Sequence, residues 1–156
     1  MRVADINKDS FTDIVIVNQF SHNFGSTKFR ISVILAKGDG SFEKPISFAE
    51  KLGYYGSNRI TDIAFGDFDG NGYPDLAIAV SSPHKVEIFL GKGDGTFGQG
   101  MTYNIDNPKL WINMKVLTGN FDGDGNEDVV VSDSSGGYIF FMEMGTEHFP
   151  LQRSCK

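Results

Sequence analysis

The sequence has few residues that could stabilise a fold by cross-linking. Cys155 is the one cysteine among 156 residues, so no disulfide can form within the chain, and we interpret Cys155 as a free thiol. No run of about eighteen apolar residues is present, so we expect no membrane-spanning helix. Residues 1–10 contain no apolar segment of the signal-peptide type. The compartment must therefore be inferred from other features.

Signatures of common enzyme classes are also missing. His22, His84 and His148 lie far apart and match no metal-ligand motif, so we interpret them as loop residues. The sequence has no nucleophile elbow, no phosphate-binding loop and no paired cysteine and histidine. The formal charge of −6 argues against nucleic-acid binding. We therefore predict a protein that has no catalytic residues, is not an enzyme and does not bind nucleic acid.

The most informative segment is the loop within GDFDGNGYPDLAIAV, residues 66–80. Oxygen donors stand at positions 1, 3, 5, 7 and 9 of this loop, namely Asp67, Asp69, Asn71, the Tyr73 carbonyl and Asp75. Calcium takes about six to eight oxygen ligands and tolerates irregular geometry, which these donors and a water could satisfy. An EF-hand would need a glutamate at position 12, where Ile78 stands. The pattern therefore predicts a calcium loop that leads directly into a buried strand.

The same spacing of donors occurs three times. The first copy comprises Asp5, Asn7, Asp9, the Phe11 carbonyl and Asp13, and the third comprises Asn120, Asp122, Asp124, Asn126 and Asp128. One such loop could be an ordinary solvated turn, but three copies favour up to three structural Ca²⁺ ions. Ser10 replaces glycine at position 6 of the first copy and must adopt a positive φ, which a Cβ disfavours. We therefore predict that the first site is the weakest.

A second motif recurs between the loops and completes a family resemblance. Lys37–Phe42 and Lys92–Phe97 share a Gly-Asp-Gly turn followed by phenylalanine, and residues 144–149 form a degraded third version. Residues 66–97 resemble the FG-GAP-like (VCBS) repeat, which is related to the repeats of integrin α-chain propellers. This resemblance implies four-stranded blades of a β-propeller, with calcium in the loop between a blade's first two strands. The chain departs from the pattern at Lys8 and Ser10, and no copy retains Gly-Ala-Pro.

We accordingly predict an all-β fold, with residues 1–156 forming one repeat domain of three four-stranded antiparallel blades. The expected blades are 1–52, 59–106 and 111–156. The expected strands are 1–4, 14–19, 29–36, 42–48, 59–65, 75–80, 85–90, 97–105, 111–117, 128–132, 138–144 and 149–152. Residues 20–28 are expected to form a protruding hairpin loop, and Pro45 requires its strand to lie at an edge.

Three blades do not close a ring, because propellers usually have about four to eight. The end faces need either the rest of a larger propeller or a second chain, which would give a homodimer with a six-bladed ring. We expect a calcium-stabilised module for protein recognition or adhesion. Three Ca²⁺ ions would offset the charge of −6. The weak calcium affinity typical of extracellular modules favours an extracellular or cell-surface location.

Two other functions stay open. The first is a carbohydrate-binding propeller, in which aromatic side chains stack on sugar rings of a glycan ligand. Its candidate residues are Tyr54, Tyr55, Tyr103 and Trp111, which could equally pack between blades. The second is a non-catalytic part of a larger polysaccharide-acting enzyme, which the family resemblance also allows.

Overall fold

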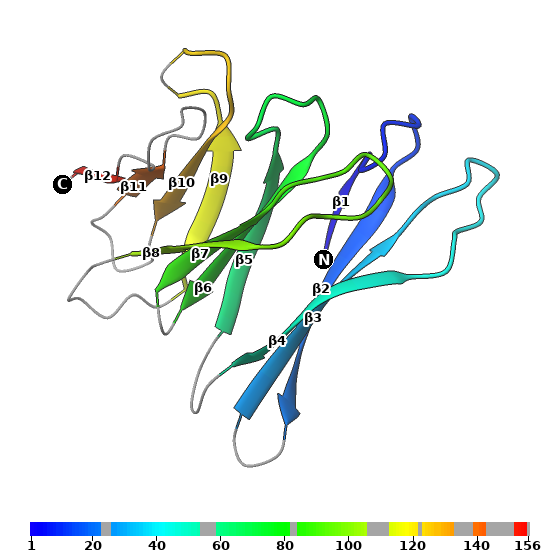
Figure 1. Cartoon of the computed structure of the whole chain (residues 1–156), viewed down its shortest axis with the longest axis horizontal. Coiled ribbons are helices and arrows are strands. Elements are labelled where there is room, and N and C mark those ends of the chain that lie inside the picture. The colour runs from blue at the N-terminus through cyan, green and yellow to red at the C-terminus, as the bar shows by residue number, and fades with distance from the viewer. Residues whose placement is uncertain are drawn as a thin grey trace.

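The computed structural model describes residues 1–22, 26–53, 59–81, 84–105, 113–121, 123–132, 139–142 and 152–155. Within these ranges the chain forms three four-stranded antiparallel sheets and no helix (Figure 1). The predicted all-β class is therefore confirmed. The same ranges accordingly contain no helix of the length and apolarity that crossing a membrane requires.

Each sheet is a meander in which strands adjacent in sequence pair with one another. The first sheet contains β1 (Arg2–Ala4), β2 (Asp13–His22), β3 (Ser26–Ile34) and β4 (Ile46–Gly53). The second contains β5 (Arg59–Gly66), β6 (Asp75–Ser81), β7 (Lys85–Phe89) and β8 (Met101–Asn104). The third contains β9 (Lys115–Gly119), β10 (Asp128–Ser132), β11 (Ile139–Met142) and β12 (Gln152–Cys155). The second sheet lies between the other two (Figure 1).

The expected protruding loop at residues 20–28 is wrong. β2 and β3 continue as a paired ladder into this segment, with Phe20 opposite Lys28 and His22 opposite Ser26, and residues 23–25 lie outside the described residues. The polar composition of the segment suggested a loop, but an exposed hairpin needs apolar residues on one face only. The Arg30 guanidinium lies 5.7 Å from the centre of the Phe20 ring, so this extension also has a side-chain contact of its own.

β4, β8 and β9 begin later than predicted, and β12 extends beyond its predicted end to Cys155, while its predicted start lies outside the described residues. Phe42 and Phe97 do not start β4 and β8 but form isolated bridges to Ala36 and Gly91. These bridges close the Gly-Asp-Gly turns, and regular pairing resumes only after several further residues. Pro45 lies just before β4, which is the edge strand of its sheet, so its missing N–H interrupts no ladder.

The core consists of two apolar layers, one on each side of the second sheet. Its strand β6 is buried along its whole length, with successive side chains on opposite faces. Leu76, Ile78 and Val80 pack towards the first sheet. Ala77 and Ala79 pack towards the third sheet. A strand covered on both faces carries a continuous apolar run, which explains the sequence Leu-Ala-Ile-Ala-Val.

The second strands of the three sheets orient their side chains in the same way relative to the neighbouring sheets. Residues are counted here from position 1 of each acidic loop, so that Asp13, Asp75 and Asp128 share position 9. Even positions face the preceding sheet: β6 packs in this way on the first sheet, and Val129 and Val131 of β10 pack on the second. Odd positions face the following sheet, as Val15 and Val17 of β2 do. The repeat is therefore directional.

Polar contacts join the first strands of neighbouring sheets. The Arg2 guanidinium lies 2.6 Å from the Asp62 carboxylate, and its Nε donates to the Ile63 carbonyl at 3.0 Å. The Lys115 amine lies 3.6 Å from the same carboxylate. These pairs are partly exposed, so each adds little to stability. They do, however, align β1, β5 and β9 along one edge of the assembly.

Candidate metal centre

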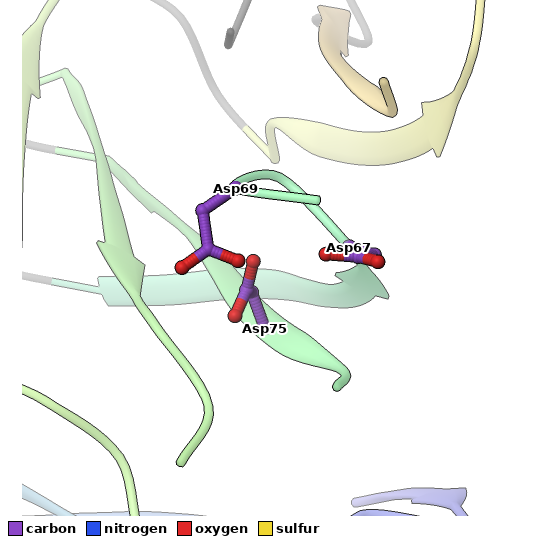
Figure 2. Close-up of side chains that lie close together, drawn as sticks. All are labelled: Asp67, Asp69 and Asp75. Carbon is purple, nitrogen blue, oxygen red and sulfur yellow. The ribbon is translucent and has the colours of Figure 1, made fainter. Parts of the chain in front are cut away.

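The three acidic loops each join the first and second strands of a sheet, and they lie at one end of the sheets (Figure 1). In the second loop, Asp67, Asp69 and Asp75 bring one carboxylate oxygen each to within 4.8 Å of the others. Figure 2 shows these carboxylates gathered beside the start of β6. Carboxylate oxygens grouped at this spacing repel one another unless a cation lies among them.

Asp75 is the first residue of β6, is fully buried and accepts hydrogen bonds from two backbone N–H groups. Its Oδ2 accepts a hydrogen bond from the Phe68 N–H at 2.7 Å, and its Oδ1 accepts one from the Gly91 N–H at 2.7 Å. Burial raises the pKa of Asp75 to about 6; the two N–H groups lower it, and nearby Asp69 and Asp67 raise it slightly further. The side chain therefore ties the loop to the residues that follow β7.

The clamp recurs in full at position 9 of the first loop and in part at position 9 of the third. Asp13 accepts hydrogen bonds from the Ile6 N–H at 2.9 Å and from the Ala36 N–H at 2.8 Å. Asp128 accepts one from the Phe121 N–H at 2.9 Å. The spacing of these aspartates predicted metal binding alone and did not indicate this second role. The available signal was that aspartate, never asparagine, precedes the apolar run in every copy.

Asp67 provides the clearest sign that a cation belongs in this loop. Its Oδ2 accepts the Gly72 N–H at 2.8 Å, whereas its Oδ1 is buried and has no hydrogen-bond partner. A buried carboxylate oxygen without a partner carries a large desolvation cost. A hard divalent cation bound to this oxygen would remove that cost. The donor set, made of oxygens only, suits calcium better than a transition metal.

Side chains at positions 3 and 5 of the second loop are held in Asx turns. The Asp69 Oδ1 accepts the Asn71 N–H at 3.1 Å, and the Asn71 Oδ1 accepts the Tyr73 N–H at 2.7 Å. Gly70 and Gly72 have φ values of 70° and 87°, a region that glycine enters without a steric cost. Alternate side chains therefore point to the inside of a tight loop.

The first loop has the same turns on a less favourable backbone. Lys8 and Ser10 have φ values of 60° and 73°, so the expected positive φ of Ser10 is confirmed and Lys8 shares it. Both Asp5 oxygens accept backbone hydrogen bonds, from Asp9 at 3.1 Å and from Ser10 at 3.0 Å. Among the described residues, no group of three acidic side chains as close as that in the second loop is found here. Both features agree with a weaker first site.

Replacing Lys8 and Ser10 together by glycine is expected to stabilise the protein. At each position, glycine removes the strain of a left-handed backbone and gains about 1–2 kcal/mol. The greater flexibility of glycine in the unfolded chain takes back about 0.5–1 kcal/mol at each position. The net increase in the free energy of unfolding is about 1–2 kcal/mol, measured by urea denaturation. As a control, Lys44→Gly changes an exposed residue that has no positive φ and should give no gain. A double variant no more stable than this control would contradict the prediction.

The third loop is described except at Asp122, which lies outside the described residues. The Asn120 Oδ1 accepts the Gly123 N–H at 2.6 Å, and the Asp124 Oδ1 accepts the Asn126 N–H at 2.8 Å. Gly123 and Gly125 have φ values of 84° and 104°. Positions 4 and 6 therefore have positive φ in all three loops, and in the third loop, as in the second, both residues are glycine.

The aromatic residue at position 7 connects each acidic loop to the Gly-Asp-Gly turn of its own sheet. The Phe11 ring lies against Gly38 and the Tyr73 ring against Gly93, and a Cβ at either glycine would overlap the ring. The third copy has Asn126 at position 7 and also lacks the Gly-Asp-Gly turn. The two motifs are therefore one packed unit, although the sequence showed them only as separate landmarks.

The Gly-Asp-Gly turns are stabilised by their central aspartates. The Asp39 Oδ1 accepts the Ser41 N–H at 2.9 Å and the Ser41 hydroxyl at 2.6 Å. The Asp94 Oδ1 accepts the corresponding groups of Thr96, at 2.9 Å and 2.5 Å. These hydrogen bonds hold the pKa of both aspartates below the ordinary value, and the bond from the hydroxyl has the larger effect. Neither aspartate takes part in the acidic loops.

The other candidate residues contribute no second site among the described side chains. Tyr103 is partly buried against the apolar layer between the second and third sheets, which is the packing role left open above. Tyr54, Tyr55 and Trp111 lie outside the described residues, as does His148. His84 is partly exposed immediately before β7, and Cys155 ends β12. The acidic loops therefore remain the candidate site.

Comparison with known proteins gives one match. The family model of the FG-GAP-like repeat matches residues 5–78 and 67–131. The two matches overlap in the second acidic loop and together include all three loops. Neither the curated proteins nor the solved structures contain a match to the chain. With most of its length matched by one repeat model and an acidic loop at the start of each second strand, the chain belongs to the FG-GAP-like repeat family.

Proposed function

We propose that the chain is a calcium-stabilised β-propeller module that acts as a non-catalytic scaffold for protein recognition or adhesion. The observation that carries the calcium assignment is the buried, unpartnered Asp67 Oδ1 beside the Asp69 and Asp75 carboxylates. The meander sheets and the family match support the propeller architecture. The adhesion role follows from the related integrin repeats and is our inference.

The second loop supplies the donors for one ion. Asp67, Asp69, Asn71 and Asp75 would contribute side-chain oxygens, and Tyr73 its backbone carbonyl. The bound ion would neutralise charge that the loop otherwise holds at close range. The loops that start at Asp5 and Asn120 would hold two further ions. Because the three loops lie at one end of the sheets, ions bound there would stabilise the loops without changing the faces or edges of the strands.

A structural role suits these aspartates better than catalysis. Both oxygens of Asp75 already accept backbone hydrogen bonds, and so do both oxygens of Asp13. A general acid or base must also reach a substrate, and both aspartates are fully buried. Tyr103 is partly buried against the apolar layer between the second and third sheets, which counts against this one residue as a sugar-stacking side chain. Reproducible sugar binding on a glycan array would instead favour the carbohydrate-binding alternative. Weak, extracellular-type calcium sites would place the module outside the cell or on its surface.

Calorimetric titration with calcium tests the proposal. We expect about three sites per chain, with dissociation constants near 10⁻⁴–10⁻³ M. Asp69→Ala should remove one site, because Asp69 contributes an exposed carboxylate to the second loop. The control Asp94→Ala removes an exposed aspartate from the turn of the same sheet and should leave every site in place. A titration without heat would contradict the calcium assignment, as would identical results for the two variants.

The same titration should depend on pH through Asp75. Its pKa of about 6 means that the metal-free side chain takes up a proton as the pH falls below that value. Calcium binds the carboxylate, so it must displace this proton. We expect the apparent affinity of the second loop to fall about tenfold for each pH unit below 6. An affinity that is the same at about pH 5 and pH 7.5 would show that Asp75 is not a ligand.

A further inference from the structure

Two hydrogen bonds connect the start of the second acidic loop to the third sheet. The Glu127 N–H, at position 8 of the third loop, donates to the Asp67 carbonyl at 3.4 Å. The Thr118 hydroxyl, from the penultimate residue of β9, donates to the Phe65 carbonyl at 2.6 Å. Phe65 and Asp67 lie on either side of the residue at which β5 ends. The third sheet therefore holds two backbone carbonyls at the point where the second loop begins.

Side chains of the third loop also contact the second loop. A Cβ at Gly66 would overlap the Glu127 carboxylate, so the third loop uses the space that this glycine leaves open. A Cβ at Gly70 would lie 3.6 Å from the Asn126 Oδ1, which is an ordinary van der Waals contact. Two consecutive residues of the third loop therefore lie against the second loop, which lies at the same end of the sheets (Figure 1).

The corresponding hydrogen bonds cannot form at the joint between the second and first sheets. Position 8 of the second loop is Pro74, which has no N–H to donate. Phe65 stands where the third sheet has Thr118, and it has no hydroxyl. Ala4 stands where the second sheet has Gly66, and it carries the Cβ that the glycine lacks. The joint between the second and third sheets therefore has a connection between its loops that the other joint cannot make.

This connection acts on the residue that matters most for the second site. The Asp67 Oδ1 is the buried oxygen that has no hydrogen-bond partner, and the Asp67 carbonyl is the group that Glu127 holds. Phe68, the next residue, is buried in the apolar layer against the third sheet, and its N–H donates to Asp75. The third sheet therefore fixes the backbone on both sides of the first ligand of the second loop.

We propose that the second and third loops bind calcium cooperatively, with Glu127 as the positioning residue that couples them. Without an ion, the charges of Asp124 and Asp128 are uncompensated and favour a looser third loop. A looser third loop holds Asp67 less well, so binding at the second loop then includes the entropy cost of ordering that residue. An ion in the third loop removes this cost in advance. By linkage, each ion raises the affinity for the other by the same factor.

Terbium luminescence measures the second loop separately, in an experiment that rests on the proposed calcium function. Tb³⁺ binds at oxygen sites in place of Ca²⁺ and luminesces when a neighbouring tyrosine is excited. Tyr73 is the one tyrosine in the three loops, because position 7 is Phe11 in the first and Asn126 in the third. The signal that Tyr73→Phe removes therefore reports the affinity of the second loop, and its displacement by calcium identifies the calcium site.

Disabling the third loop is expected to weaken binding at the second loop. Asp124→Ala removes a ligand at position 5 of the third loop and should lower the affinity of the second loop about fivefold or more. Asp9→Ala removes the equivalent ligand of the first loop. It should change the affinity of the second loop less than about twofold, because Pro74 cannot make the connecting bond. Equal effects of the two variants would overturn the proposal.

Glu127→Pro tests whether the coupling passes through the described contacts. The substitution copies Pro74, which occupies the same position in the second loop, and it removes the N–H and the carboxylate while keeping every donor of the third loop. In this background, Asp124→Ala should change the affinity of the second loop less than about twofold. An undiminished effect would show that charge acts through space, and it would overturn the coupling role of Glu127. Thr118→Val removes the other hydrogen bond at nearly constant shape and should also reduce the effect of Asp124→Ala.

The outcomes separate the cooperativity from the calcium function itself. A Tyr73-dependent signal that calcium displaces, with an affinity that Asp124→Ala does not change, would overturn the cooperativity alone. The absence of any signal that calcium displaces would contradict the calcium assignment and the cooperativity together. Cooperative thermal unfolding of each variant checks that it is folded, and Thr118→Val provides the test of the contacts if Glu127→Pro does not fold.

Discussion

Replacing Asp75 by alanine is expected to lower the free energy of unfolding by about 2–6 kcal/mol at saturating calcium, in addition to the loss of the bound ion. The Phe68 and Gly91 N–H groups would lose their acceptor, and a buried donor without a partner costs about 1–3 kcal/mol. Gly91 cannot shift to find another partner easily, because the Pro74 carbonyl lies directly against it. Saturating calcium matters because, without the ion, removal of a buried carboxylate with a raised pKa would partly offset the loss.

Two variants give this experiment its controls. Asp75→Asn keeps one acceptor oxygen and should lose about half as much stability as Asp75→Ala. Asp69→Ala removes an aspartate of the same loop that accepts one exposed backbone hydrogen bond. Apart from the loss of the ion, this variant should lower the free energy of unfolding by less than about 1 kcal/mol. Urea denaturation of the four proteins in calcium and in chelator separates the clamp from the metal. Equal losses for Asp75→Ala and Asp69→Ala in calcium, where both variants lose the ion, would show that the clamp contributes nothing.

Removing calcium is expected to lower the melting temperature by about 10–20 °C. An ion present at a hundred times its dissociation constant stabilises the folded state by about 2.7 kcal/mol per site, and the second and third loops provide two such sites. A domain of this length gains about 2–4 °C per kcal/mol. Circular dichroism melts in excess calcium and in chelator measure the difference directly.

Magnesium provides the matched control for the calcium melts. It needs near-ideal octahedral geometry and gives up its waters reluctantly, so the same concentration should raise the melting temperature much less than calcium does. Equal shifts with both ions would indicate general screening of the acidic loops rather than a coordinated site. A melting temperature that does not change with calcium would contradict the proposed structural role.

The sequence predicted strand boundaries most accurately where a single residue determines the start of the strand. β6 and β10 begin at Asp75 and Asp128, as expected, because a buried aspartate both closes the loop and starts the ladder. The spacing of glycines also predicted the left-handed backbone, including its strained form at Ser10. Local chemistry decides these features, so a single copy of the motif contains the information.

Features that depend on neighbouring sheets could not be predicted in this way. Phe97 has strand propensity and follows a turn, yet it packs between two sheets instead of starting β8. The clamp formed by Asp75 joins residues 16 apart in sequence, and no local pattern shows that Gly91 donates to it. The contact of Tyr73 with Gly93 is equally remote. Only the packed arrangement shows that aspartate, aromatic ring and glycine act together.

The common polarity of the three sheets has a consequence for how such chains change length during evolution. Recombination between equivalent points, for example the codons of Asp13 and Asp75, would add or delete one whole sheet. The new neighbours would still meet with even positions against odd ones, as the present sheets do. Such a duplication would need no compensating substitutions at the joint beyond adjustment of side-chain volume. A directional stack therefore makes changes in repeat number easier to tolerate than changes within a repeat.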